Sequence, residues 1–214
     1  MRFERGFAVV TAVAITIGIG LTRPSVSEAQ VLADSRRTTF GLMVGWNIPA
    51  GGFFDEHWNT GFALSGSAKR LWTDNLLGGF EFGYSWHGLD TESFQQQYPQ
   101  YGVTGGDLSV MPLVAVADYF FGSSSATVRP FVTGGLGAYF LFTNNIQLSG
   151  PTSIGLNTYS DSTNFGAFAG GGIFIRRSDT WGVRVDASYA SVFGDGEDVA
   201  YVPIRVGIHW TPVF

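Results

Sequence analysis

Residues 202–214, the last stretch of the chain, alternate between apolar side chains and polar or small ones. One face is aliphatic and aromatic and carries Ile204, Val206, Ile208, Trp210 and Phe214. The other face carries Arg205, Gly207, His209 and Thr211. This period of two predicts a β-strand with unlike surroundings on its two sides. Because a strand at a chain end leaves an unpaired sheet edge, closure of a barrel onto the first strand is the simplest solution.

The same rhythm recurs along the chain between short runs of turn-forming residues. Eight strands are predicted, over residues 39–48, 61–72, 76–87, 107–121, 129–142, 164–176, 181–193 and 202–214. In the fourth and fifth segments the pattern does not decide which face points into the lumen. Pro112 and Asp118 fit poorly inside a fully paired strand, so Pro112 is expected at a rim or bulge and Asp118 near a membrane boundary.

Composition decides which face of the barrel points inward. Only 14% of the residues are charged, against about 25% in average soluble proteins. A small closed barrel has a narrow interior that side chains fill. Glycine, serine, threonine and paired ions fit that interior, whereas the Phe, Tyr and Trp face suits lipid. The sequence therefore predicts an all-β, closed, antiparallel, up-and-down transmembrane β-barrel of eight strands.

The connections differ in length and charge. They are short after the second, fourth and sixth strands, long after the first, third and fifth, and intermediate after the seventh. This predicts short periplasmic turns and longer extracellular loops, with ten strands as the alternative if a long loop hides a hairpin. The outer loops contain nine acids and no Lys or Arg: Asp55, Glu56, Asp90, Glu92, Asp107, Asp161, Asp195, Glu197 and Asp198. A polyanion-binding surface and a nucleic-acid partner are therefore disfavoured.

The amino-terminal region predicts export from the cytoplasm. Arg2 and Arg5 precede an uncharged run over residues 7–21, and 27–29 reads as a small-x-small cleavage site. Residues 1–29 are expected to be a secretory signal peptide, 30–37 a short periplasmic lead, and 38–214 the barrel. The chain has no cysteine, which excludes disulfides, thiolate chemistry and a lipid-modified cysteine anchor.

Three segments carry a resemblance to a known family: Leu71–Leu76, Val128–Gly137 and Trp210–Phe214. On these segments the chain resembles the small outer-membrane β-barrel superfamily that includes OmpX, the OmpA barrel domain and OmpW, over about residues 37–214. The resemblance implies the bacterial outer membrane as location, its lipid as surroundings, and the barrel insertion machinery as a partner. It also implies that Ile208, Trp210 and Phe214 belong to the carboxyl-terminal signal that this machinery reads.

The best candidate site is the set of charges predicted to face the lumen: Lys69, Glu81, Arg184, Asp186 and Arg205. Unpaired charges in a narrow interior are costly, so these side chains are expected to form ion pairs across the lumen. Their main expected role is structural, a plug that holds the interior together. A gated proton or ion path is the less favoured interpretation, since eight strands leave little room for water.

Other functions are weighed against a structural or surface-interaction role without enzymatic activity. An OmpW-like conduit or binder for small hydrophobic molecules needs an apolar outer lumen; Met43, Leu77 and Leu141 favour one, whereas Glu81 and Arg184 oppose it. Ser85 and His87 share a face, as in a lipid A-modifying enzyme, but no motif of such enzymes surrounds them. His57, His87, Asp55 and Glu56 match no metal-ligand spacing, and residues 195–198 lack the EF-hand arrangement. No cofactor or metal is expected.

Overall fold

The computed structural model describes residues 38–97, 99, 102–144, 146–149, 154–156, 161–194 and 199–212. The predicted signal peptide, the lead and Phe214 lie outside these residues. No helix within the described ranges is long and apolar enough to cross a membrane.

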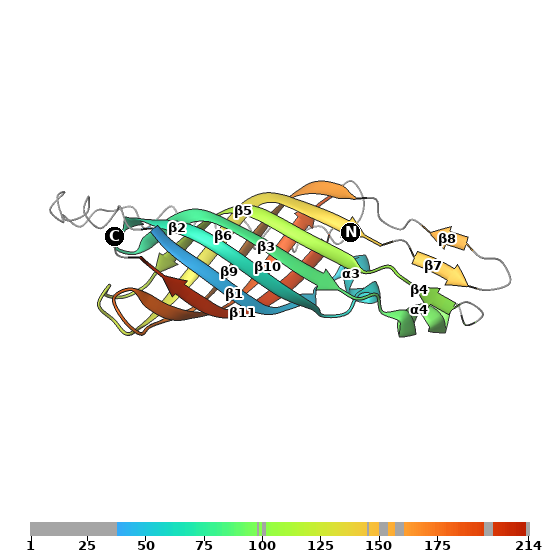
Figure 1. Ribbon diagram of the computed structural model, residues 1–214, viewed down its shortest axis with the longest axis horizontal. Helices are drawn as coiled ribbons and strands as arrows, with labels where there is room; N and C mark the ends of the chain where they lie inside the picture. Colours follow the sequence, from blue (N-terminus) through green and yellow to red (C-terminus); the bar gives the residue numbers. More distant parts are fainter. Residues whose placement is uncertain are drawn as a thin grey trace, which may run out of the picture.

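Eight antiparallel strands close into a tilted barrel (Figure 1), which confirms the predicted fold class. They are β1 (Thr38–Pro49), β2 (Gly61–Thr73), β3 (Leu76–His87), β5 (Leu108–Phe120), β6 (Val128–Thr143), β9 (Ser162–Arg176), β10 (Trp181–Phe193) and β11 (Val199–Trp210). Each strand pairs with its neighbour along the chain, and β1 pairs with β11 from Phe40–Trp210 to Pro49–Tyr201. The last strand begins at Val199 rather than at residue 202 and ends at Trp210, so Thr211 and Pro212 lie beyond it.

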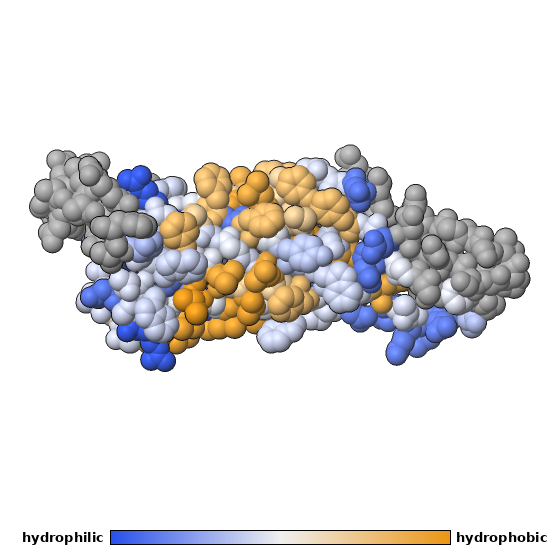
Figure 2. All heavy atoms as spheres, in the orientation of Figure 1, coloured by the Kyte–Doolittle hydropathy of each residue, from blue (hydrophilic) through white to orange (hydrophobic). Residues whose placement is uncertain are grey.

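The large apolar side chains of the wall point outward. On β1, Trp46 is 59% exposed while its neighbour Asn47 is 4% exposed. The same alternation holds on β3, β10 and β11. In Figure 2 apolar residues gather in a band around the middle of the barrel, with hydrophilic residues toward both ends. A continuous apolar band around the outside of the wall is the pattern of a barrel that meets lipid.

Long connections gather at one end of the barrel and short turns at the other (Figure 1). The long connections contain two short helices, α3 (Gly52–His57) and α4 (Thr91–Gln97), and a separate antiparallel sheet of β4 (Gly102–Thr104), β7 (Ile146–Ser149) and β8 (Ile154–Leu156). These three strands project from the barrel instead of extending its wall, so the described chain has an eight-stranded barrel and not the ten-stranded alternative. This separation of short turns from long loops matches the arrangement predicted from the sequence, in which the short turns are the periplasmic ones.

Pro112 is not at a rim or a bulge, contrary to the expectation from the sequence. It is the fifth residue of β5, and the β3–β5 register stays constant on either side of it. The pairing of β3 with β5 is instead interrupted around Pro112: it stops at Phe82–Leu113 and resumes at Ser85–Val110. Pro203 interrupts the β10–β11 pairing in the same way, because proline has no backbone N–H to donate. The register shift in the wall occurs elsewhere, between Leu71 and Thr73 of β2.

Candidate functional site in the barrel lumen

Six charged side chains form a closed ring across the lumen. Lys69 comes from β2, Glu81 from β3, Asp118 from β5, Arg184 and Asp186 from β10, and Arg205 from β11. Each occupies an inward position of its strand, and Arg184 and Asp186 share a face because they are two residues apart. In the barrel order, β10 and β11 lie across the lumen from β3 and β5. The ring therefore connects opposite walls.

Cations and carboxylates alternate around the ring. Asp118 Oδ2 accepts from Lys69 Nζ at 2.7 Å and from Arg184 Nη1 at 2.6 Å. Asp186 accepts from Arg184 Nε at 2.7 Å and from Arg205 Nε at 2.9 Å. Arg205 Nη1 donates to Glu81, whose other oxygen lies 3.9 Å from Lys69 Nζ and closes the ring.

The ring is almost fully removed from water, and its charges compensate one another. Arg184 is 1% exposed and Asp118 is 0% exposed. Three cations face three carboxylates, so this level of the lumen carries no net charge. Thr133 donates to Asp118 Oδ1 at 2.6 Å, and the Arg184 guanidinium lies 4.0 Å from the centre of the Phe131 ring. Each buried charge needs these hydrogen-bond and ion-pair partners, because a buried charge without partners is strongly destabilising.

All five charged residues singled out in the sequence lie in this ring, and one member was missed. Asp118, expected near a membrane boundary, points into the lumen and accepts from both Lys69 and Arg184 of the ring. The sequence contained a signal for it, because the five predicted residues hold three cations and only two carboxylates. Asp118 is the one further acid that falls within a predicted strand segment clear of its ends, so charge balance selects it.

The outer half of the lumen is filled by an apolar cluster. Its buried members are Phe54, Trp58, Leu89, Leu108, Val110, Val114, Val116, Tyr139, Leu141, Phe168, Ala190, Val192, Val199 and Tyr201. Leu141 belongs to it, as the apolar-lumen hypothesis required. Met43 is buried opposite Ser65, at the level of the ring, and Leu77 pairs with Asp118 toward the periplasmic end.

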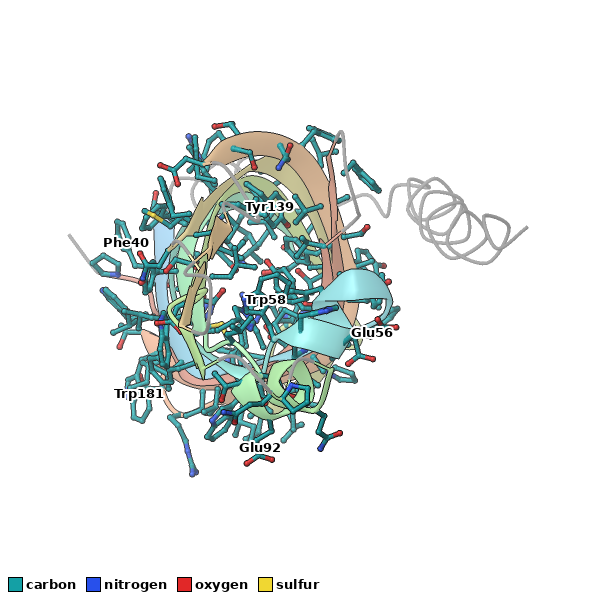
Figure 3. All side chains as sticks on the ribbon, turned by 90° about the vertical axis from the view of Figure 1, so that its right-hand side faces the viewer. Phe40, Glu56, Trp58, Glu92, Tyr139 and Trp181 are labelled. Atoms are coloured by element: carbon teal, nitrogen blue, oxygen red, sulfur yellow. The ribbon has the colours of Figure 1, made fainter. Side chains whose placement is uncertain are left out.

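Helix α3 closes the outer mouth of this half. Phe54 and Trp58 point inward and are buried, and Trp58 Nε1 donates to the carbonyl oxygen of Gly106 at 2.8 Å. The backbone N–H of Asn59 donates to Gly88 at 2.9 Å, which fixes the end of the segment to the next loop. Seen from the loop end in Figure 3, Trp58 lies within the barrel outline and Glu56 at its periphery.

The periplasmic end is closed by aromatic rings. Phe120 lies 5.3 Å from Phe131 and 6.0 Å from Phe174, measured between ring centroids. The Arg129 guanidinium lies 4.9 Å from the Phe120 ring and donates to Asn75 Oδ1 at 2.7 Å. The ring of charges thus lies between two apolar layers.

The residues considered for catalysis or metal binding do not converge. Ser85 Oγ bonds the carbonyl of Val110 at 3.5 Å, and His87 Nδ1 bonds the carbonyl of Asn59 at 3.2 Å. Asp55 and Glu56 are exposed on α3, whereas His87 is buried beneath it. Among the residues that the structure describes, no group of three or more His, Cys, Asp or Glu could hold a metal ion.

The residues proposed as an insertion signal are placed only in part. Ile208 and Trp210 are exposed on the lipid-facing side of β11, 51% and 41% respectively. Phe214 lies outside the described residues. Their role in targeting stays a prediction.

Among solved structures similar to this chain, Neisserial surface protein A shares the fold. Its crystal structure covers 82% of this chain and 97% of that protein, at 14% identity and a TM-score of 0.57. A major outer membrane protein of Thermus thermophilus covers 82% of this chain and 99% of its own, at 12% identity and a TM-score of 0.49. The attachment invasion locus protein Ail of Yersinia pestis covers 81% and 97%, at 15% identity and a TM-score of 0.44. No curated protein matches the sequence.

The sequence pattern of one family covers most of the chain. It is described as the outer membrane protein beta-barrel domain, and it matches residues 19–211. Together with the closed barrel, the lipid-facing apolar band and the sidedness of the loops, this match establishes both the family and the location. The chain is a bacterial outer-membrane protein that belongs to the outer membrane protein beta-barrel domain family.

Proposed function

We propose that this protein is a non-enzymatic outer-membrane barrel that presents its loops at the cell surface and keeps its lumen closed. The observation that carries the proposal is the ring of six charges between two apolar layers. Ions that enter such a lumen would have to displace partners held at 2.6 to 2.9 Å. A barrel of eight strands leaves no second path for water around side chains packed in this way.

Conductance across a planar bilayer tests the closed lumen. The refolded full chain is expected to give no steady ionic current. The double variant R184A/R205A removes both guanidinium groups that cross the lumen and is expected to conduct, provided that it still migrates as a folded barrel before boiling. Steady current through the unchanged protein would reject the proposal.

The surface role rests on the loops. Asp55 and Glu56 on α3 and Glu92 on α4 are exposed, and the outer loops contain no Lys or Arg. An acidic surface of this kind suits a partner with basic or hydrogen-bonding groups and disfavours a polyanion.

Accessibility in intact cells tests the sidedness on which this role depends. Because the chain has no cysteine, a single introduced cysteine is the one thiol that a reagent can label. E56C and E92C are expected to react with a membrane-impermeant thiol reagent, whereas the matched variant S178C, in a periplasmic turn, reacts only after the outer membrane is opened. Labelling of S178C in intact cells would mean that the short turns face the outside and the long loops face the periplasm, which contradicts the proposal.

A lipid A-modifying activity is disfavoured by the surroundings of Ser85 and His87. Both side chains are buried in the lumen, at 2% and 0% exposure, and each bonds a different backbone carbonyl. A hydrolase needs the base within reach of the nucleophile and both within reach of the substrate. Lipid A mass spectra from cells with and without the gene are expected to be identical; a gene-dependent species would revive the enzymatic hypothesis.

A conduit for small hydrophobic molecules is the second candidate, favoured by one observation. The interrupted β3–β5 pairing at Pro112 lies beside the apolar outer half of the lumen and weakens the wall there. Liposomes containing the protein are expected to show unchanged permeability to apolar solutes if the lumen is closed. Increased permeability that is lost in P112V would favour the conduit instead.

A further inference from the structure

Two arginines lie side by side at the short-turn end of the lumen. Arg129 is the second residue of β6, and Arg176 is the last residue of β9. Arg129 pairs with Phe174, and Arg176 lies two residues beyond that partner on the same face. Diagonal neighbours of this kind are about 7–8 Å apart, within reach of long side chains. The Phe174 ring lies 6.0 Å from the buried Phe120 ring, so this face, with both arginines, points into the lumen mouth.

Among the residues that the structure describes, neither of these two arginines forms an ion pair with a carboxylate. Arg129 Nη2 donates to Asn75 Oδ1 at 2.7 Å and to the backbone oxygen of Asp74 at 3.4 Å. Arg176 Nη2 donates to the carbonyl oxygen of Ser124. These acceptors are all neutral, and the two guanidinium groups repel each other. Neighbouring like charges are destabilising, so the pair favours an anion that contacts both groups.

The arginine pair keeps unused hydrogen-bond donors at the lumen mouth. Arg129 is only 6% exposed, and its Nε is buried without a partner. The bond to Asn75 and the Phe120 ring, 4.9 Å away, hold its guanidinium in place. Arg129 Nη1 and the Nη1 and Nε atoms of Arg176 also form no hydrogen bond within the described ranges, and they are not buried. A fixed guanidinium with open donors, beside a second one, suits the oxygens of a phosphate group.

The turn between β5 and β6 adds hydroxyl groups beside the two arginines. This turn begins at Gly122, whose φ is +82°, and it contains three exposed serines, Ser123, Ser124 and Ser125. The bond from Arg176 to the Ser124 carbonyl holds the turn against the lumen mouth. Ser123 Oγ and Ser125 Oγ lie 2.8 Å apart. Serine hydroxyls are common donors to phosphate oxygens, so the turn extends the set of donors that the arginines present.

We propose that Arg129, Arg176 and the serine turn form a binding site for one phosphate group at the short-turn end of the barrel. Two sources carry this group: free inorganic phosphate, and the headgroup of an anionic phospholipid in the adjoining leaflet. Trp72 and Trp181 are 56% and 43% exposed on the outside of the wall at the same end, and exposed tryptophans suit the level of the lipid headgroups. The site goes beyond the closed-lumen function and needs no passage through the barrel, because it lies on the short-turn side of the ring of charges.

Titration of the full-length protein with inorganic phosphate tests the site. The protein is held in maltoside micelles, which contain no phosphate, and the ionic strength is kept constant. The side-chain Nε–H resonances of ¹⁵N-labelled arginine are followed. The resonances of Arg129 and Arg176 are expected to shift until the site is saturated. Those of Arg184 and Arg205, which are enclosed in the ring of charges, are expected to stay in place.

R176Q and R177Q form a matched pair, because each removes one positive charge at the same end of the barrel. Arg177 is exposed in the turn that follows β9. R176Q is expected to weaken phosphate binding about tenfold, the factor that corresponds to one net hydrogen bond, whereas R177Q changes it less than about twofold. R129K keeps the charge but loses the planar fork, and it is expected to weaken binding as R176Q does. Each variant is first checked for migration as a folded barrel before boiling.

Dihexanoyl phosphatidylglycerol, added to the same micelles, distinguishes the two sources, with dihexanoylglycerol as the control without phosphate. Binding of the phospholipid at least as tight as that of inorganic phosphate, and weakened by R176Q, assigns the site to a lipid headgroup. Binding of inorganic phosphate alone assigns it to the free anion, and both results support the site. The proposal is overturned if neither compound shifts the two arginine resonances. It is also overturned if R177Q weakens binding as much as R176Q, because the effect would then be general charge attraction.

Discussion

Replacement of Asp118 by asparagine tests whether the ring of charges stabilises the barrel. The carboxylate of Asp118 accepts from Lys69, from Arg184 and from Thr133, at distances of 2.6 to 2.7 Å for the closest contact of each. D118N keeps the shape but leaves a net charge of +1 in a lumen that excludes water. Removal of one partner from a buried ion pair costs about 3–5 kcal/mol, and we expect D118N to lower the free energy of unfolding by that amount.

The double variant K69M/D118N separates the charge effect from the loss of packing. It restores a neutral lumen, so its cost should be smaller than the sum of the two single variants. A coupling energy of about 2 kcal/mol is expected for residues that share one network. D179N, in an exposed turn, is the control and should stay within about 0.5 kcal/mol of the unchanged protein.

Equilibrium unfolding by urea in phospholipid vesicles, followed by tryptophan fluorescence, measures these free energies. The slower migration of boiled samples on gels checks independently that each variant starts as a folded barrel. The reasoning is refuted if D118N costs less than about 1 kcal/mol, well below the range for a broken buried pair, or if K69M and D118N are additive. Either result would mean that water or relaxation of the wall satisfies the charges as well as the ring does.

Three further predictions concern the wall, the cap and targeting. G172A should cost about 2–3 kcal/mol in urea unfolding, because a Cβ there would lie 2.0 Å from a backbone oxygen of β10, whereas G66A, with no atom closer than 3.9 Å, should be neutral. W58F keeps the ring but loses the hydrogen bond to Gly106; amide exchange in α3 should become faster by about tenfold, with β11 unchanged. F214A should lower the amount of folded protein in the outer membrane of cells while leaving refolding in vitro unchanged; an equal loss in both assays would argue against a targeting role.

The faces of most strands could be read from the sequence, and the physical reason is the contrast between lipid and lumen. Where the lumen-facing residue is a charge, serine or glycine, as along β3 and β10, alternation assigns the face directly. The assignment stayed open in β5, because Val110, Val114 and Val116 face an apolar part of the lumen and are as hydrophobic as their outward neighbours. Asp118 was misplaced for the same reason: its strand carries no polar rhythm that would reveal its phase.

Helix α3 could not be predicted from local sequence. It is only six residues long, well below the length at which a helix is stable in isolation. Phe54 of the helix and Trp58 directly after it become buried only because the barrel mouth lies directly beneath them.

The ring also bears on how the barrel closes. Arg205 and Glu81 are 124 residues apart in the sequence, and Arg184 and Asp118 are 66 apart, so neither contact can form until strands from opposite sides of the barrel are in place. Before closure each of these charges remains hydrated. After closure each is stabilised mainly by the others, so a barrel that lacks one wall gains little from a partial ring. The ring therefore stabilises the barrel with a closed β1–β11 seam relative to partly closed states. D118N should accordingly broaden the urea transition as well as shift it, because intermediates with an open seam become closer in free energy to the closed barrel.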